Sequence, residues 1–596
     1  MFAACTAPAL LETEKKSRRA CGIAIPMLAL SAMLVSTKAA AAIECSLPAL
    51  QKLNVASMTV TSAKPVPAAP PKQAYCDVKG SVATNGEGAG PGSAGFAITL
   101  PANWNGKYMF GGVRGTGGNL NSAANKPDID TAMVQGYAHV TSDGGHLGSD
   151  ETWYYSGRPG VPNVPKLTDY FYRATHQVTI ATKELVKGYY GANRIARAYF
   201  NGCSNGGRQA LMEAIRYPDD YDAVIAGCPW LDPAGSALLN VQRSKGFLDP
   251  ANYIPLNRFT EIDNAVLARC DTLDGVKDGL IQNPNKCDFD PHSLVPHLLT
   301  RAQASALDNY LNAVRDEKGN VIHPGSSVSR LQAQFNGVRN NRDGSPLRAM
   351  LYETPAPFPT AASPWGEGKN ESHNWSSARG VITELALNDP SFDLNNGLFQ
   401  KNGAPKPDVM KNIYDRLATE IVADPARIQP FLKKGGKIIM YHGLSDVTIA
   451  AGGTILYYQA LAEQDGGYEK LQNQVRLYVV PGMQHCNDGP EPVFFDTLDA
   501  LDQWVEKGVA PNGMIAAYTE DAGKKVTRTL PVCQFPQMAR YSGSGDVNDA
   551  KNWHCASDDR RMLELGRNGI QAGLNADLMQ YTSKYKGLPV ANMMKF

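Results

Sequence analysis

The stretch from residue 198 to residue 208 constrains this chain more than any other. It reads as a strand, a sharp turn and a helix, and its centre, Gly202-Cys203-Ser204-Asn205-Gly206, has the G-x-S-x-G pattern of a nucleophile elbow. The two glycines remove Cβ atoms that would clash where the backbone folds back on itself. Such a turn raises the Ser204 hydroxyl to the top of a sheet. Gly and Ser are common residues, so the pattern needs support from elsewhere in the chain.

The segments around this turn predict a mostly parallel sheet with helices on both faces. We expect strands at 93–101, 107–110 and 137–142, and a long amphipathic helix over 166–188 that Gly188 ends. Apolar, β-branched runs at 436–441 and 475–480 are typical of buried parallel strands. The predicted fold class is therefore α/β.

A long insertion interrupts this order. Residues 231–430 are rich in Asn, Pro and Gly and show little strand alternation. We expect them to fold as an inserted lid domain between two parts of the core, at 43–230 and 431–556. Residues 557–596 read as a helical C-terminal extension with no assigned role.

The first 42 residues have the pattern of an export signal. A basic group at 15–19 precedes an apolar stretch at 20–36, and Ala39 to Ala42 offer a small-residue cleavage site. The apolar stretch is short for a spanning helix, so we favour cleavage over a membrane anchor, and Arg18-Arg19 leaves twin-arginine export open. We expect a secreted or periplasmic protein without a stable membrane anchor. The net charge of +1 gives no indication of a nucleic-acid partner.

The cysteines agree with an oxidising compartment. Removal of the signal takes Cys5 and Cys21 from the eleven cysteines and leaves an odd number, with Cys228, in an apolar run, as the expected unpaired thiol. Sequence alone does not fix the pairing of the other eight. The simplest local pairs, followed by the two residues that remain, are Cys45–Cys76, Cys270–Cys287, Cys533–Cys555 and Cys203–Cys486.

Two strand ends supply partners for a serine nucleophile. The strand at 437–441 leads to Asp446, and the strand at 476–480 leads to His485. In α/β-hydrolases the order is serine, acid and then histidine, each at a strand's carboxyl end, so we assign Asp446 as the acid and His485 as the base. His442 is an alternative base.

Other residues near strand ends carry weaker hypotheses. Asp143 and His146 follow the strand at 137–142 and are expected to brace a loop rather than to act in catalysis. If Ser204 and His485 lie within hydrogen-bonding reach, their neighbours Cys203 and Cys486 also meet. A disulfide there would fix the nucleophile relative to the base.

A second cluster of polar residues lies in the insertion. Asp271, Asp274 and Asp278 stand within eight residues, with glycines among them, and hard carboxylate oxygens suit Ca²⁺. The twelfth-position Glu of an EF-hand is missing. The simpler interpretation is a solvated turn rich in Asp and Gly.

The motifs Gly202-Cys-Ser-Asn-Gly-Gly-Arg208, Tyr441-His-Gly-Leu-Ser-Asp446, Val480-Pro-Gly-Met-Gln-His-Cys486 and Arg540-Tyr-Ser-Gly-Ser-Gly-Asp546 resemble the tannase and feruloyl esterase family. Cys203-Ser204, Asp446 and His485-Cys486 match its CS–D–HC signature. The resemblance implies an α/β-hydrolase core. It implies that Gly112, in the glycine-rich loop, joins the N–H of Asn205 as an oxyanion hole. It also implies a structural calcium ion in the lid, bound by the carboxylates of Asp271, Asp274 and Asp278 and the carbonyls of Val276 and Leu280.

The catalytic assignments predict a serine esterase that needs no organic cofactor, and the resemblance implies that its substrates are small esters of aromatic acids. We expect a hydroxycinnamate (feruloyl) or gallate (tannase) ester, with the former favoured. A terephthalate monoester is a weaker alternative, because Ile449 stands where the family's terephthalate enzyme has an aromatic residue. A non-catalytic polyphenol- or carbohydrate-binding protein is the alternative of another class. Specificity is expected to lie at 360–390, in Trp365, His373, Trp375, Ser376, Ser377 and Arg379.

Overall fold

A nine-stranded mixed sheet organises the part of the chain that the computed structural model describes, which is residues 42–148, 153, 160–336, 373–417, 425–486, 489, 491–520 and 525–557. The strand order is β1-β2-β3-β5-β4-β6-β7-β10-β11. Their bounds are Met58–Val66 (β1), Tyr75–Thr84 (β2), Gly92–Pro101 (β3), Lys107–Gly111 (β4), Ala138–Ser142 (β5), Arg197–Cys203 (β6), Ala223–Gly227 (β7), Lys437–Gly443 (β10) and Val475–Val480 (β11).

The sheet is antiparallel at one side and parallel over the rest. Neighbours from β1 to β3 and on to β5 pair antiparallel, and every later pair, from β5 to β11, is parallel. The parallel strands β7 and β11 are buried along their whole length, as their apolar sequences predict. Parallel strands place their carboxyl ends at one edge, which brings β6, β10 and β11 to a common site.

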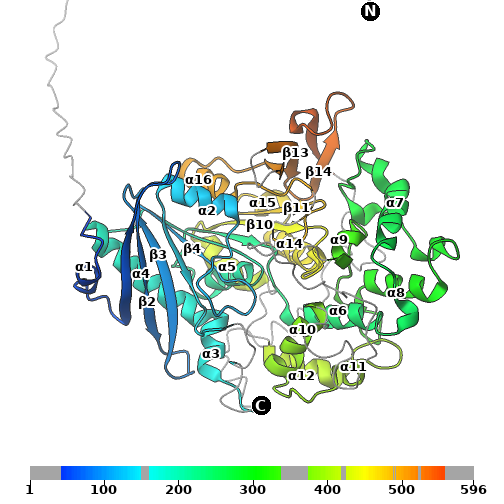
Figure 1. Cartoon of the computed structure of the whole chain (residues 1–596), viewed down its shortest axis with the longest axis horizontal. Helices are drawn as coiled ribbons and strands as arrows, with labels where there is room; N and C mark the ends of the chain where they lie inside the picture. The colour runs from blue at the N-terminus through cyan, green and yellow to red at the C-terminus, as the bar shows by residue number, and fades with distance from the viewer. Residues whose placement is uncertain are drawn as a thin grey trace, which may run out of the picture. The chain divides into compact units, whose positions relative to one another are not determined.

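Helices cover both faces of this sheet (Figure 1). Alternate strand residues point to opposite faces, so Phe200 joins a core cluster with Val178 of α4, whereas its neighbour Tyr199 joins another with Leu501 of α16. One face packs against α4 (Ala174–Tyr190), α5 (Asn205–Arg216) and α14 (Ala451–Asp465), and the other against α2 (Lys126–Gln135) and α16 (Thr497–Lys507).

The helix predicted over 166–188 has different bounds and is not regular. It begins as α3 (Val164–Thr168), passes through a π-helical turn at Asp169–Arg173 and continues as α4 to Tyr190. The prediction that Gly188 ends the helix is wrong. Gly191 does so with φ of 59°, whereas Gly188 lies within the helix and leaves room for Leu53, whose Cδ2 would be 3.0 Å from an added Cβ.

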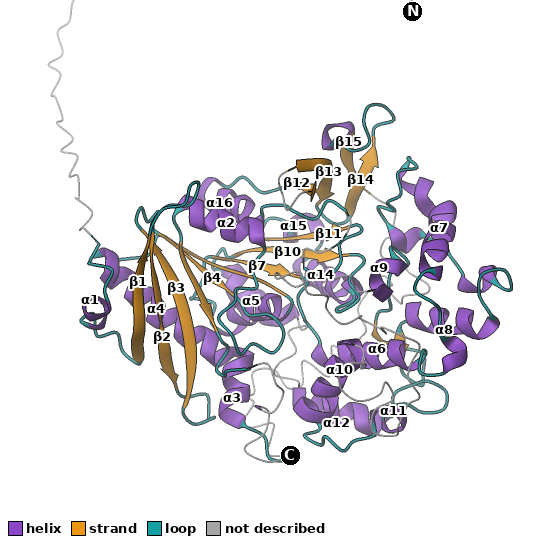
Figure 2. Cartoon of the chain, in the orientation of Figure 1, coloured by secondary structure: helices purple, strands orange, loops and turns teal. Residues whose placement is uncertain are grey.

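The insertion between β7 and β10 is mostly helical where it is described (Figure 2). Its two short strands, β8 and β9, form a hairpin outside the main sheet. Its elements are α6 (Pro233–Lys245), α7 (Arg258–Cys270), α8 (Arg301–Leu311), β8 (Val314–Arg315), β9 (Val321–His323), α9 (Leu331–Asn336), α10 (His373–Arg379), α11 (Leu394–Gly397), α12 (Pro407–Leu417) and α13 (Gln429–Lys433), with a π-helical turn at Gly380–Ala386 and 3-10 turns at Pro250–Asn252, Asp271–Asp274, Pro284–Lys286, Pro291–Leu294 and Pro425–Ile428.

Two small hairpins follow the main sheet. They are β12 (Gly513–Glu520) with β13 (Lys525–Cys533), and β14 (Gln537–Tyr541) with β15 (Trp553–Ser557). The remaining elements are α1 (Leu47–Gln51), α15 (Tyr468–Leu471) and a 3-10 turn at Ala550–Asn552.

Some predictions fall outside the described residues. These are residues 1–41 of the signal peptide predicted at 1–42, the part of the specificity segment that includes Trp365, and the C-terminal extension beyond residue 557. Within the described ranges, no helix is both long enough and apolar enough to cross a membrane.

Candidate active site

Ser204 sits at a strained turn between β6 and α5, as the G-x-S-x-G pattern predicts. Its φ is 67° and its ψ is −125°, values that L-residues rarely adopt. The turn closes tightly, because a Cβ on Gly202 would lie 2.6 Å from the main-chain carbon of Gly206. The main-chain N–H of Ser204 donates to the carbonyl of Gly227 at 2.9 Å, which ties the elbow to the end of β7.

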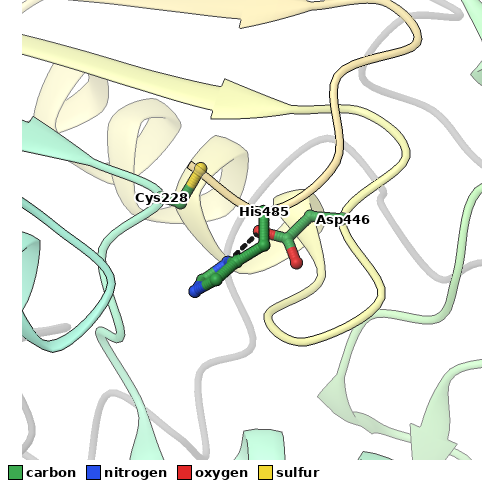
Figure 3. Close-up of side chains that lie close together, drawn as sticks. All are labelled: Cys228, Asp446 and His485. Carbon is green, nitrogen blue, oxygen red and sulfur yellow. Dashed lines mark hydrogen bonds and ion pairs between the residues drawn. The ribbon is translucent and has the colours of Figure 1, made fainter. Parts of the chain in front are cut away.

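The three residues assigned to catalysis form one hydrogen-bonded chain. The Oγ of Ser204 lies 2.8 Å from the Nε2 of His485, and the Nδ1 of His485 lies 2.7 Å from the Oδ2 of Asp446. Figure 3 shows the second of these contacts, with the imidazole ring pointing one nitrogen at the carboxylate. Asp446 follows β10 and His485 follows β11, so neighbouring parallel strands bring the acid and the base together.

Asp446 is held as a buried anion. Its Oδ1 accepts hydrogen bonds from the main-chain N–H groups of Thr448 at 2.8 Å and Ile449 at 3.0 Å. Burial alone would raise the pKa of Asp446, but the charge of His485 and hydrogen bonds from His442 and His485 outweigh it and hold that pKa well below its usual range. An ionised carboxylate in this position can orient the ring of His485 and stabilise its protonated form.

His442 is not placed as the base. Its Nε2 lies 2.9 Å from the carbonyl of Ile449 and 3.3 Å from the Oδ2 of Asp446, and its Nδ1 lies 2.8 Å from the hydroxyl of Thr454. Both ring nitrogens therefore have partners other than Ser204. Asp143 braces a loop, because its carboxylate accepts from the N–H groups of Gly95 and Gly145. Burial raises the pKa of Asp143 to about 6.

His146 also has a neighbour away from Ser204. Its ring stacks on Trp153, with ring centroids 4.1 Å apart. The contacts of both Asp143 and His146 therefore agree with a bracing role.

The predicted disulfides are confirmed. The Cα atoms of the bonded pairs lie 5.5 to 5.8 Å apart, and the pairs are Cys45–Cys76, Cys203–Cys486, Cys270–Cys287 and Cys533–Cys555. Cys228 is buried and takes no part in a disulfide, as expected. Its Sγ accepts a hydrogen bond from the N–H of Cys486 at 3.3 Å, and it lies beside Asp446 and His485 in Figure 3.

The main-chain N–H groups of the two predicted oxyanion donors, Asn205 and Gly112, differ in whether they already have an acceptor. Asn205 is the first residue of α5, and no acceptor within the described ranges bonds its main-chain N–H, as is usual at a helix start. The N–H of Gly112 instead donates to the carbonyl of Asn201 at 3.0 Å, as the rung after the β4–β6 ladder. Gly112 serves close packing, because an added Cβ would lie 2.8 Å from the Cα of Gly206.

Two residues of the insertion hold the acid loop, which is the loop that contains Asp446, at 444–450 between β10 and α14. No pattern in the sequence singled them out. The guanidinium of Arg243 on α6 donates to the carbonyl of Val447 at 2.8 Å, and the amide of Asn374 on α10 reaches the same carbonyl at 3.3 Å. Both side chains are fully buried. An arginine in a helix without an acidic residue close by in sequence is only a weak signal of such a role. The sequence does not identify its partner, because that partner is a backbone carbonyl 204 residues away.

The predicted calcium residues lie where the insertion meets β13. Asp271 and Asp274 are buried, and burial followed by the nearby charge of Asp278 raises the pKa of Asp274 to about 7, although the N–H of Gln282 opposes the shift. One oxygen of Asp278 accepts from the N–H of Leu280, and the other pairs with Arg528. The possible metal ligands are all oxygen atoms, which is the chemistry that Ca²⁺ requires. In this arrangement, however, one carboxylate oxygen of Asp278 is already paired with Arg528.

Comparison with known proteins places the chain in one family. A family model described as tannase and feruloyl esterase matches residues 76–556. A probable feruloyl esterase of Arthroderma benhamiae is 30% identical over 77% of this chain and 82% of its own length. The mono(2-hydroxyethyl) terephthalate hydrolase of Piscinibacter sakaiensis is 28% identical over 81% of this chain and 85% of its own.

Solved structures confirm the fold. Feruloyl esterase B from Aspergillus oryzae superposes with a TM-score of 0.70 at 24% identity, covering 85% of this chain and 98% of that one. Tannin acyl hydrolase from Aspergillus niger gives 0.64 at 20% identity, over 87% and 97%. The core is thus an α/β-hydrolase fold and the protein is a carboxylic ester hydrolase. This chain belongs to the tannase and feruloyl esterase family.

Proposed function

We propose that this protein is an exported serine esterase that cleaves esters of aromatic acids, of the feruloyl esterase type, through Ser204, His485 and Asp446. The observation that carries the proposal is the continuous hydrogen-bonded chain from the Ser204 hydroxyl through His485 to a buried carboxylate. A serine hydroxyl is a weak nucleophile until a base within hydrogen-bonding reach removes its proton.

The geometry supports a two-step mechanism. Ser204 attacks the ester carbonyl carbon as the Nε2 of His485 takes its proton, and Asp446 stabilises the imidazolium through Nδ1. The N–H of Asn205 donates to the developing oxyanion, and His485 then protonates the leaving alcohol. Water, deprotonated by His485, attacks the acyl-enzyme and releases the aromatic acid. The backbone strain at Ser204 keeps the hydroxyl at the sheet edge throughout.

The substrate assignment rests on the relatives. Several are named probable feruloyl esterases, and one is a hydrolase of a terephthalate monoester, an ester of another aromatic acid. A gallate ester is the second candidate, because a tannin acyl hydrolase shares the fold. The insertion acts as the lid that selects among them, since Arg243 and Asn374 already join it to the acid loop.

Export and calcium complete the proposal. Four disulfides in the described chain favour an oxidising compartment, outside the cell or in the periplasm. A Ca²⁺ ion would be held by Asp271, Asp274 and Asp278 with the carbonyls of Val276 and Leu280. It would neutralise buried carboxylates and stabilise the base of the insertion, away from the chemistry.

One comparison tests the catalytic and substrate assignments together. The kcat/KM of the wild type is measured on methyl ferulate, methyl gallate and a terephthalate monoester, beside Ser204→Ala. We expect the ferulate ester to give the highest value and the variant to lose hydrolysis with an unchanged circular dichroism spectrum. Substantial activity of the variant refutes the role of Ser204, and a preference for another ester refutes the substrate.

A further inference from the structure

A second cluster of chemically active side chains lies at the carboxyl end of α5, the helix that begins directly after Ser204. His176 of α4, Glu213 of α5 and Asp220, in the turn before β7, each bring one ligand atom within 4.8 Å of the other two. Glu213 is nine residues along α5 from Ser204, which is about 13 Å at 1.5 Å per residue. The proposed catalytic mechanism uses none of the three residues.

Glu213 is the unusual member. Its side chain is only 1% exposed, and neither carboxylate oxygen has a hydrogen-bond partner among the described residues. A buried carboxylate without partners is costly unless a proton or a cation neutralises it. Because neither oxygen is paired in the described part of the chain, the buried carboxylate of Glu213 is placed for a neutralising partner, which is either a proton or a cation.

Lys183, whose charge acts on Glu213, is directed elsewhere. The ammonium of Lys183 donates to the main-chain carbonyl of Asp220 and lies 4.9 Å from the ring centroid of Tyr221 and 5.6 Å from that of Tyr108. It makes no ion pair with Glu213 in the described structure. Lys183 thus lowers the local negative charge but leaves the Glu213 oxygens without a donor.

The other two ligands are positioned and accessible. The Nδ1 of His176 lies 2.6 Å from the Oδ2 of Asp220, and the two side chains are 22% and 13% exposed. The His176 ring stacks on Tyr217, with centroids 3.7 Å apart, which fixes its orientation. An ion could enter from this side and keep water as further ligands.

The position on the helix also favours a cation. Glu213 lies in the last turn of α5, where the carbonyl end of the helix carries partial negative charge. One imidazole and two carboxylates, a mixed nitrogen and oxygen set, suit a first-row divalent ion such as Zn²⁺ better than Ca²⁺.

From this geometry we propose that His176, Glu213 and Asp220 form a second metal site, which binds a divalent transition-metal ion of the Zn²⁺ class. The ion replaces the close His176–Asp220 contact with two metal bonds and gives the Glu213 carboxylate its partner. It joins α4 to the end of α5 and to the turn that leads into β7. The site has a structural role separate from the ester chemistry.

The competing explanation is a single proton. If Glu213 is protonated, it can donate to Asp220 and needs no metal. That arrangement predicts no specific zinc binding, and it predicts that Glu213→Gln, which keeps a donor at this position, is at least as stable as the wild type without metal.

The test uses the full chain, stripped of metal and with Ca²⁺ present to occupy any oxygen-only site. Zn²⁺ is titrated by calorimetry, and Co²⁺ replaces it for visible absorption, in the wild type, Glu213→Gln and His176→Asn. Glu184→Gln, an exposed carboxylate on α4 paired with Lys187, is the matched control.

We expect the wild type and the control to bind one Zn²⁺ that both site variants lose or bind at least about tenfold more weakly, since even indirect metal partners contribute that much. Cobalt absorption should be lost in parallel, and metal-free ester hydrolysis should be equal in all four proteins. Should Glu213→Gln fail to fold, His176→Asn and Asp220→Asn decide. Equal Zn²⁺ binding by wild type and site variants, or no binding by the wild type, overturns the proposal.

Discussion

Cys203 and Cys486 are covalently joined with their Cα atoms 5.8 Å apart, although 283 residues separate them in sequence. Cys203 precedes Ser204 and Cys486 follows His485, so the bond ties the neighbours of the proposed nucleophile and the proposed base together. The Oγ of Ser204 and the Nε2 of His485 are 2.8 Å apart. The disulfide therefore constrains the distance across which the proposed mechanism moves a proton.

The double variant Cys203→Ala/Cys486→Ala should lose activity more than a distant disulfide variant does. Loss of the clamp lets Ser204 and His485 drift, and a misplacement of 1 Å can cost about 100-fold in rate. We expect kcat to fall by about 10- to 100-fold and the melting temperature to drop. Cys45→Ala/Cys76→Ala is the control, which should lower only the melting temperature. Equal kcat in the wild type and the Cys203/Cys486 variant would contradict a positioning role.

Substitution of the two histidines near Asp446 should separate the base from its neighbour. His485→Ala should reduce kcat by about 10⁴-fold or more, as loss of a triad member does in serine hydrolases. His442→Gln should keep most of the activity and lower stability, because Thr454 and Ile449 lose their partner. Steady-state kinetics on a p-nitrophenyl ester measure both. The reverse pattern would make His442 the base.

Arg243 should act as a positioning residue for the acid loop. Arg243→Met keeps much of the side-chain volume but leaves the Val447 carbonyl with one donor fewer, a loss of about 1–3 kcal/mol for a buried group. We expect kcat to fall about tenfold with KM little changed, and Arg243→Lys to recover part of it. Arg269→Met, in an exposed ion pair with Asp288, is the control and should be neutral. A change in KM alone would instead place Arg243 in substrate binding.

Asp128 should make stability depend on pH. Burial, followed by the charge of Asp496, raises the pKa of Asp128 to about 7 from an ordinary value of 3.8. The native state then holds a proton that the unfolded chain releases between about pH 4 and 7, so the free energy of unfolding falls as pH rises through this window. Thermal melts from pH 4 to 8 should show this decline, and it should be smaller in Asp128→Asn.

The surroundings of Asp128 can accommodate the asparagine of Asp128→Asn, and the same helix provides a control variant. The Oδ1 of Asn201 has no partner in the described structure, so a rotated Asn201 amide can accept from the amide that the substitution introduces. Asp130→Asn, on the same helix, is the control, because the pKa of Asp130 is lowered from its ordinary value rather than raised. An unchanged slope in Asp128→Asn would exclude Asp128 as the source.

Removal of Ca²⁺ should lower stability without directly affecting the chemistry. We expect a calcium-specific chelator to lower the melting temperature of the wild type, and added Ca²⁺ to restore it, whereas Asp274→Asn should respond to neither. Ester hydrolysis well below the melting temperature should change little. A melting temperature that ignores both chelator and Ca²⁺ would remove calcium from the proposal.

Local sequence patterns are sufficient for much of the fold. Ser204 is recognisable because the G-x-S-x-G turn between a strand and a helix needs small residues on both sides, and β10 and β11 are recognisable because strands buried on both faces are mostly apolar. Helix ends are less predictable. Gly188 has the residue type of a helix end, but packing against Leu53 uses its missing Cβ, and Gly191 supplies the left-handed turn.

The residue types of the site and their order can be predicted without a structure: a serine at an elbow, an acid and a histidine after two later strands, and cysteines beside two of them. These follow from chemistry that is local to a few residues. Other relationships exist only in the folded chain, in which Gly112 completes a ladder, Arg243 holds the acid loop, and His176, Glu213 and Asp220 meet. Such contacts join distant segments through packing and backbone carbonyls, which leave no pattern along the chain.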